Sequence, residues 1–152
     1  MELDFDGVTA SHTDQALILQ GERPLEILAS AVSGGGLTRA RWIINRHVDK
    51  DYDHPDPARD LQDFAQSQGI DEPFVGLLTA VYMRKARAVT LHRAGLTVAA
   101  VVTAGISNAT AVGLSRPVIL RPGTINVVLL IDACLTPAAM VNAVITATEA
   151  KT

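Results

Sequence analysis

Two polar segments of this chain each border a strongly apolar run, where side chains could bind an amide or help to hydrolyse it. The first is the stretch TAGISN at positions 103–108, which follows an apolar run. A strand fixes the position of the loop that follows it, and that loop exposes backbone amides and hydroxyls. Thr103, Ser107 and Asn108 could therefore offer donors and acceptors to an amide or a phosphate. A strand-terminating turn whose side chains satisfy one another explains the same residues.

The second segment, PGTIN at positions 122–126, immediately precedes the most hydrophobic run of the chain. Gly123 permits a sharp entry, and Thr124 and Asn126 point the same way if the segment is extended. A hydroxyl and a carboxamide placed together could hold a scissile carbonyl or stabilise its oxyanion. A turn entering a buried strand accounts for these residues without any chemistry.

A third cluster is polar and rich in acidic residues, and its members are His47, Asp49, Asp51, Asp53 and His54. Imidazole and carboxylate groups are ligands for several divalent metals. The spacing matches no strict metal-binding motif, so we expect a solvated acidic loop and no metal site. No Ser or Cys nucleophile with its His and Asp partners is legible, and the glycine-rich SGGGL at 33–37 lacks the lysine of a phosphate-binding loop.

The elements that must position these segments mix strands with helices. The expected strands are apolar runs bounded by turn-forming residues, at positions 16–19, 25–31, 39–48, 86–92, 95–104 and 127–133. The break Gly21-Glu22-Arg23-Pro24 predicts a hairpin, and the near-continuous apolar run 127–133 predicts a central strand buried on both faces. Asp56-Pro57 and Thr136-Pro137 each predict the start of a helix.

We therefore expect an α+β fold, a single domain over residues 1–152 in which a mixed sheet with hairpins packs against a few helices. Hydrophobic residues make up 48% of the chain, enough for a sizeable core. The net charge of −3 argues against nucleic-acid binding, which needs a concentrated basic face. The apolar runs are shorter than the roughly 20 residues of a membrane helix, and the start MELDFDGVTA has no signal pattern, so we expect a cytoplasmic protein without a membrane partner.

Taken together and in order, several stretches resemble the adenosylcobinamide amidohydrolase family of corrinoid salvage, and the chain looks like a short member of it. They are SAVSGGGLTRARWIINRHV, DYDHPDP, VGLLTAV, VVTAGISNAT and RPGTINVVLLIDACLTPAAMVNAVITATEAKT. The resemblance implies hydrolysis of the amide that joins a corrin propionate to the aminopropanol arm of adenosylcobinamide. The products would be adenosylcobyric acid and aminopropanol or its phosphate. Cobalt would arrive inside this corrinoid substrate, and the resemblance implies no separate cofactor.

Residue chemistry, read within that resemblance, assigns hypothetical roles. Asn45, Asn108 and Asn126 are candidate carbonyl or oxyanion partners; Thr124 or Ser107 could act as nucleophile or hold water; and Asp132 could be a general base. The triple glycine would let the flat corrin approach the backbone. The candidate substrate-binding residues are Gly34, Gly35, Gly36, Tyr52, Thr103, Gly105, Gly123, Glu149 and Lys151.

Members of this family usually continue beyond the segment that matches TEAK, with a further aspartate-containing motif, whereas this chain ends at Thr152. We therefore expect a shortened protein, a homo-oligomer that borrows the segment from another chain, or a protein that binds without hydrolysing. Two other functions stay open: a non-catalytic corrinoid-binding module, and a metal-dependent hydrolase that uses His47 and the aspartates.

Overall fold

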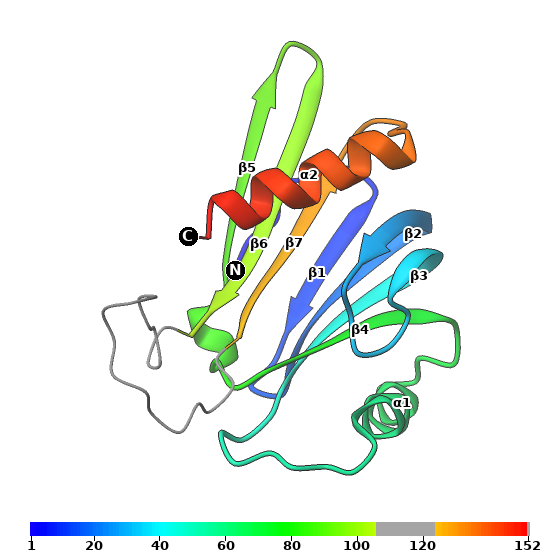
Figure 1. Ribbon diagram of the computed structural model, residues 1–152, viewed down its shortest axis with the longest axis vertical. Coiled ribbons are helices and arrows are strands. Elements are labelled where there is room, and N and C mark those ends of the chain that lie inside the picture. Colours follow the sequence, from blue (N-terminus) through cyan, green and yellow to red (C-terminus); the bar gives the residue numbers. More distant parts are fainter. Residues whose placement is uncertain (106–123, 152) are drawn as a thin grey trace.

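A computed structural model describes residues 1–105 and 124–151 and divides their strands between two sheets (Figure 1). The first sheet has four strands in the order β1-β2-β3-β4, and the second has three in the order β5-β6-β7. The elements are β1 (Val8–His12), β2 (Ala16–Ala29), β3 (Gly36–His47), α1 (Pro57–Ser67), β4 (Phe74–Thr79), the 3₁₀ turn η1 (Met83–Lys85), β5 (Arg87–Arg93), β6 (Leu96–Ala104), β7 (Ile125–Ile131) and α2 (Pro137–Glu149). The predicted α+β class is confirmed.

The first sheet is mixed because β4 reaches it through a helix. Strands β1, β2 and β3 form an antiparallel meander, whereas β4 runs parallel to β3. A parallel neighbour requires a crossover connection, and α1 supplies it. The α1 side chains Leu61 and Ala65 are buried against Ile44 and Phe74 of the sheet. The two parallel strands therefore end together at one edge of the molecule.

Strand β2 runs straight through the segment that predicted a hairpin turn. Its pairing with β3 jumps from Gln20 opposite Trp42 to Leu25 opposite Ala40, which marks a bulge. Pro24 has no N–H to donate, and a bulge is one of the few places in a sheet where that loss is tolerated. The hairpin predicted at 21–24 is therefore wrong, because the glycine and proline bend the strand without reversing it.

The second sheet contains the predicted hairpin of β5 and β6. Ala94 and Gly95 in its turn both have positive φ, as the two-residue turns that match strand twist require. Strand β7 pairs with β6 alone within this sheet, and among its residues only Leu130 is buried. The prediction of a central strand buried on both faces is wrong, since β7 is an edge strand with one apolar side turned away from the core.

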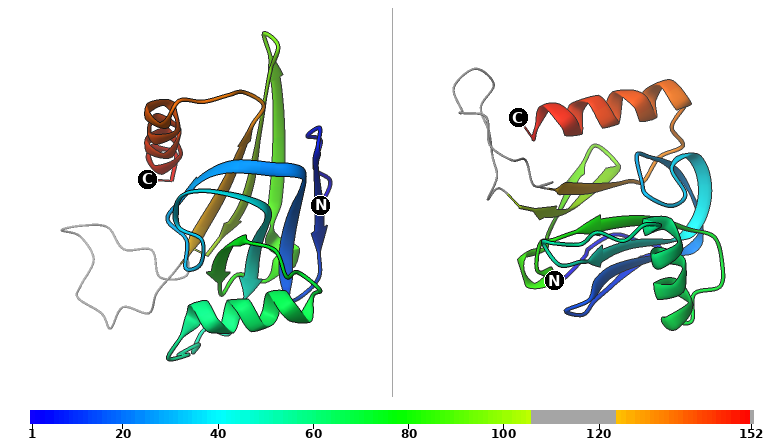
Figure 2. Two further views of the ribbon diagram at one scale, coloured as in Figure 1. Left: turned by 90° about the vertical axis from the view of Figure 1, so that its right-hand side faces the viewer. Right: turned by 60° about the horizontal axis from the view of Figure 1, so that its bottom comes forward.

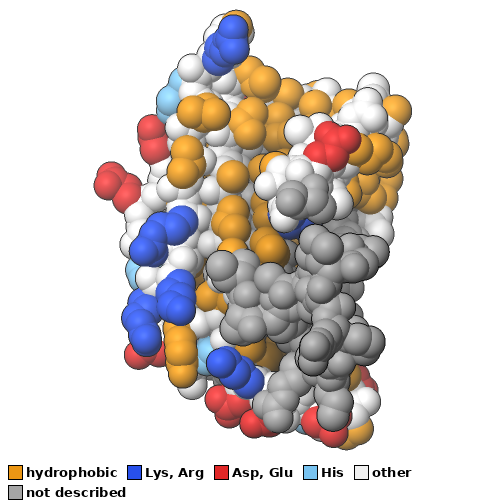
Figure 3. All heavy atoms as spheres, turned by 60° about the vertical axis from the view of Figure 1, so that its left-hand side comes forward, with side chains coloured by type: hydrophobic (Ala, Val, Ile, Leu, Met, Phe, Trp, Pro, Cys, Tyr) orange, Lys and Arg blue, Asp and Glu red, His pale blue; other side chains and the backbone are white. Residues whose placement is uncertain are grey.

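The two sheets face each other, with α1 on one side and α2 on the other (Figure 2). Both helices begin as predicted: Asp56 accepts a hydrogen bond from Arg59 N, and Thr136 accepts one from Ala139 N. No residue of α2 is buried, and hydrophobic side chains gather on the visible face of the second sheet (Figure 3). No helix in the described residues is long and apolar enough to cross a membrane.

The core fills the space between the sheets. Its buried members come from both sides: Leu17, Leu19 and Ile43 from the first sheet and Ala99, Val101 and Leu130 from the second. Because successive strand residues point to opposite faces, the inward row of β3 continues from Ile43 to Asn45, and that of β6 continues from Val101 to Thr103. The apolar core therefore gives way to polar side chains at one end.

Candidate active site

A buried hydrogen-bond network connects the two sheets at that end. Asn45 Nδ2 donates to Thr103 Oγ1 at 2.9 Å, and Asn126 Nδ2 donates to Asn45 Oδ1 at 2.8 Å. Asn126 Nδ2 also donates to the Leu78 carbonyl oxygen at 2.9 Å. Asn45 is 4% exposed and Thr103 is fully buried. The network therefore ties together β3, β4, β6 and β7, four strands that come from separate parts of the sequence.

These contacts restrict what the network can do chemically. A carboxamide nitrogen carries two hydrogens, and those of Asn126 are directed at two protein oxygens. In this arrangement the Asn126 amide has no hydrogen left for an oxyanion. The fold thus brings together three residues that the sequence singles out: Asn45, Thr103 and Asn126. Their hydrogen bonds hold the strand ends in place.

A cleft of about 770 Å³ opens directly beyond the network. Along β3, His47 follows Asn45 by two residues on the same face, and Ala80 comes directly after the end of β4. The cleft is lined by Asp14, Gln15, Arg46, His47, Val48, Asp49, Lys50, Asp51, Tyr52, Ala80 and Tyr82. Its volume lies in the range of about 300–1,000 Å³ that small-molecule sites occupy.

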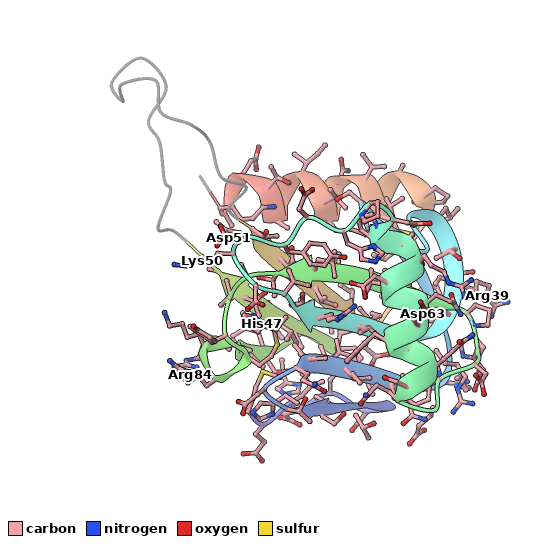
Figure 4. The ribbon with its side chains drawn as sticks, turned by 90° about the horizontal axis from the view of Figure 1, so that it is seen from below. Arg39, His47, Lys50, Asp51, Asp63 and Arg84 are labelled. Carbon is pink, nitrogen blue, oxygen red and sulfur yellow. The ribbon has the colours of Figure 1, made fainter. Side chains whose placement is uncertain are left out.

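His47 is held firmly at the inner end of the cleft. Its backbone N–H donates to the Gln15 carbonyl at 2.7 Å, and the next N–H, of Val48, donates to the Thr79 carbonyl at 2.9 Å. The imidazole packs against the Tyr82 ring, with 5.1 Å between the ring centroids and a tilt of 38°. The Arg84 guanidinium carbon lies over the Tyr82 ring, 4.6 Å from its centroid. Figure 4 labels His47 and Arg84.

Tyr52 lines the cleft, and a cluster of charged residues holds its hydroxyl in place. The hydroxyl donates to Asp60 Oδ2 at 2.7 Å, and Arg46 Nη1 lies 2.6 Å from the same oxygen. Burial and the hydrogen bond to Asp60 raise the pKa of Tyr52 to about 12. The Arg46 guanidinium holds the pKa of Asp60 below its usual value. The Tyr52 hydroxyl is therefore uncharged at neutral pH, and its hydrogen bond to Asp60 fixes the position of the side chain.

The acidic loop divides between the cleft and its surroundings. Asp49, Asp51, Asp53 and His54 are all exposed, and of them only Asp49 and Asp51 line the cleft. Across residues 1–105 and 124–151, no three His, Cys, Asp or Glu side chains come close enough together to hold a metal ion.

The three glycines lie far from this cleft. They precede and begin β3, whereas Asn45 and His47 end it. At Gly34, which has a φ of +68°, an added Cβ would lie 2.4 Å from the Phe74 carbonyl oxygen. Gly35 lies close to the backbone just before it, since a Cβ there would lie 3.0 Å from the Ala31 carbonyl oxygen. Gly36 faces open space. At Gly34 the missing side chain makes room for the backbone of β4.

Other candidate residues are also dispersed. Asp132 follows the far end of β7 from Asn126 and lines a small hollow with Asp4, His92 and Thr97. Glu149 and Lys151 lie at the end of α2, and neither lines the cleft. The structure does not bring these three together with the network.

Two candidates lie where β6 ends and β7 is about to begin. Gly105 N donates to the Thr124 carbonyl at 3.2 Å, which extends the pairing of the two strands. A Cβ at Gly105 would lie 3.0 Å from Val81 Cγ2, so this strand end also borders the segment after β4. Ser107, Asn108 and Gly123 lie outside the described residues.

Sequence reasoning considered His47 only as a metal ligand and did not consider Tyr82 or Arg46. A local signal for His47 exists, because it shares a strand face with Asn45. For Tyr82 there is none, since its contact with His47 joins segments separated by α1 and β4.

Comparison with known proteins identifies the same family that the sequence stretches resemble. The family model of adenosylcobinamide amidohydrolase matches residues 4–152. A curated protein named adenosylcobinamide amidohydrolase, from Methanosarcina mazei, is 33% identical over 138 residues. The alignment covers 91% of this chain and 62% of that relative, so the chain spans less than two thirds of its length. No solved structure matches. The chain therefore belongs to the adenosylcobinamide amidohydrolase family.

Proposed function

We propose that this protein hydrolyses the amide between the corrin ring and the aminopropanol arm of adenosylcobinamide, giving adenosylcobyric acid for corrinoid salvage. The observation that carries the proposal is the cleft at the ends of β3 and β4, which opens beside the buried Asn45 network in a chain of this family. The reaction consumes one water: the carbonyl carbon gains an oxygen, the C–N bond breaks, and the nitrogen leaves as an amine.

The cleft suits the arm of the substrate better than the whole substrate. Its volume lies in the range of sites that hold drug-sized ligands, and Tyr52 and Tyr82 line it with aromatic rings. We place the amide inside the cleft and the broad corrin at its mouth. Cobalt then stays within the substrate, outside the cleft, and the proposal needs no separate cofactor.

The side chains take different parts in this proposal. Asn45, Thr103 and Asn126 position the strand ends through their hydrogen bonds. Thr124, immediately before β7, and Ser107 stay candidates to hold water or act as a nucleophile, and Asn108 stays a candidate oxyanion partner. Ser107 and Asn108 lie outside the described residues. The proposal gives Asp132 no part in the reaction, because Asp132 follows the opposite end of β7 from Asn126.

Incubation with adenosylcobinamide tests the proposal directly. Chromatography should show adenosylcobyric acid and the released amine in equal amounts. A shift in corrinoid absorbance without any product would instead favour a non-catalytic corrinoid-binding module. If neither product nor shift appears at saturating substrate, both functions are overturned for this chain.

The metal-dependent alternative has its own test. Activity that survives dialysis against a chelator would count against a hydrolytic metal held by His47 and the aspartates. Loss of activity with the chelator, restored by a divalent metal, would favour it. The homo-oligomer and the cytoplasmic location stay predictions of the sequence.

A further inference from the structure

The two ring nitrogens of His47 have different surroundings. Nδ1 is inaccessible to solvent and has no hydrogen-bond partner among the described residues. The residue nevertheless lines the cleft and is partly exposed, so its accessible surface belongs to atoms other than Nδ1. The backbone hydrogen bonds on both sides and the Tyr82 ring fix how the imidazole sits.

This asymmetry selects a tautomer. A hydrogen on Nδ1 would be a buried donor without an acceptor, which is rare in folded proteins and costs about 1–3 kcal/mol. A bare Nδ1 is a buried acceptor without a donor, which folded proteins tolerate more often than an orphaned donor, so we expect the hydrogen to reside on Nε2. The neutral ring in this form presents a hydrogen-bond donor, not a base, on the side away from Nδ1.

We propose that His47 donates its Nε2 hydrogen to the scissile carbonyl oxygen of the substrate amide and stabilises the oxyanion that forms there. The inference rests on the amide hydrolysis proposed above, and it names a donor outside the Asn45 network. Asn126 directs both amide hydrogens at protein oxygens, whereas His47 is the next inward-facing residue after Asn45 and reaches the cleft.

Hydrolysis of the amide consumes one water molecule. Water adds its oxygen to the carbonyl carbon, and the C=O electron pair moves onto the oxygen that accepts the His47 hydrogen bond. When that pair returns, the C–N bond breaks, and the nitrogen leaves with the proton that the water gave up. The Nε2 hydrogen stays on His47 throughout, so the imidazole contributes a donor aimed at developing charge and no net proton.

Replacing His47 by glutamine and by asparagine distinguishes a hydrogen-bond donor at the Nε2 position from a side chain that only fills space. The amide nitrogen of glutamine reaches about as far as Nε2 of histidine, whereas that of asparagine reaches only about as far as Nδ1. We expect His47→Ala and His47→Asn to lower kcat about 10²–10³-fold, the usual effect of losing one oxyanion donor, with little change in KM. His47→Gln should recover at least about tenfold of that loss.

The matched control is His92→Ala. His92 is exposed on β5 and bonds to Asp4 and Thr97 beside the small hollow, so its removal should leave kcat unchanged. Thermal unfolding of all variants shows whether a lost rate reflects a lost fold. His47→Gln, which keeps most of the side-chain volume, remains informative if the alanine variant does not fold.

The tautomer is measurable without turnover. In the free protein labelled with ¹⁵N-histidine, the chemical shifts of the two His47 nitrogens should be those of a neutral ring protonated at Nε2. A ring protonated at Nδ1 overturns the inference whatever the kinetics show. If the unaltered protein hydrolyses adenosylcobinamide but His47→Ala keeps its rate, or His47→Gln is no better than His47→Asn, only the role of His47 fails. If the unaltered protein releases no product, the proposed function fails and the role of His47 with it.

Discussion

Asn126 on β7 donates a 2.8 Å hydrogen bond to Asn45 on β3, and this contact joins the two sheets beside the cleft. The partners are 81 residues apart in the chain. Both side chains sit where the apolar rows of their strands end, so the bond connects the core to the proposed site.

Truncating this contact should destabilise the protein. Asn126→Ala leaves Asn45 Oδ1 and the Leu78 carbonyl without their donor, which we expect to cost about 1–3 kcal/mol of unfolding free energy. Urea denaturation measures the change. Asn142→Ala, on the exposed side of α2, is the control and should stay within about 0.5 kcal/mol. Equal stabilities of the two variants would mean that the network does not hold the sheets together.

Alkaline pH should weaken the fold through Tyr52. Burial and the bond to Asp60 raise the pKa of Tyr52 from 10.0 to about 12, so the folded state favours the neutral hydroxyl. That stabilisation is complete below pH 10 and is lost as the pH rises through 12. Unfolding free energies across this range should fall less steeply in Tyr52→Phe than in the unaltered protein. Tyr82→Phe is the control, and a slope that Tyr52→Phe leaves unchanged would contradict the prediction.

Acidic pH should act on the same cluster through Asp60. The Arg46 guanidinium lowers the pKa of Asp60 below 3.8, so the charged carboxylate adds stability at neutral pH that is lost as the pH falls through that lowered value. Asp60→Asn should therefore be less stable than the unaltered protein at pH 7, and the difference should shrink on acidification. Asp63→Asn, whose carboxylate forms an exposed ion pair with Arg59, tests whether any acidic residue of α1 behaves this way. A difference that stays constant with pH would remove Asp60 from the acid response.

The glycines before β3 should respond to alanine according to their own surroundings. Gly34 and Gly36 both have positive φ, which costs an alanine about 1–2 kcal/mol. Gly34→Ala should cost more, because its Cβ would also press on the Phe74 carbonyl at 2.4 Å, whereas Gly36 has open space. Thermal unfolding compares the pair. Loss of corrinoid hydrolysis in a stably folded Gly36→Ala would restore a substrate role to this segment.

Asp132→Ala should keep the hydrolysis rate within about twofold of the unaltered protein, since loss of a general base would cost about 10²–10⁴-fold. The reason is its position, at the other end of β7 from Asn126 and the cleft. The assay is release of adenosylcobyric acid under saturating substrate. A loss of a hundredfold or more in a folded variant would show that the reaction takes place elsewhere.

Local features of the fold were predictable because their causes are local. Asp56-Pro57 and Thr136-Pro137 cap their helices with their own side chains, and the turn between β5 and β6 needs only residues that adopt positive φ. The segment Gly21–Pro24 was wrongly predicted to be a hairpin turn, because its structure depends on strand pairing and not on its own residues. A bulge and a turn use the same residue types, and only the pairing of β2 with β3 distinguishes them.

The sequence by itself determined the family, the α+β class, the polar segments that border strands at Thr103 and Asn126, and Asn45 as a candidate polar residue. The tertiary structure alone decided which of these side chains meet. It placed the glycines and Asp132 away from the cleft, and it directed both amide hydrogens of Asn126 at protein oxygens. It also placed His47 at the cleft, in contact with Tyr82. The physical reason is that alternation along a strand fixes which way a side chain points, whereas what it contacts depends on strands that pair and pack across long stretches of chain.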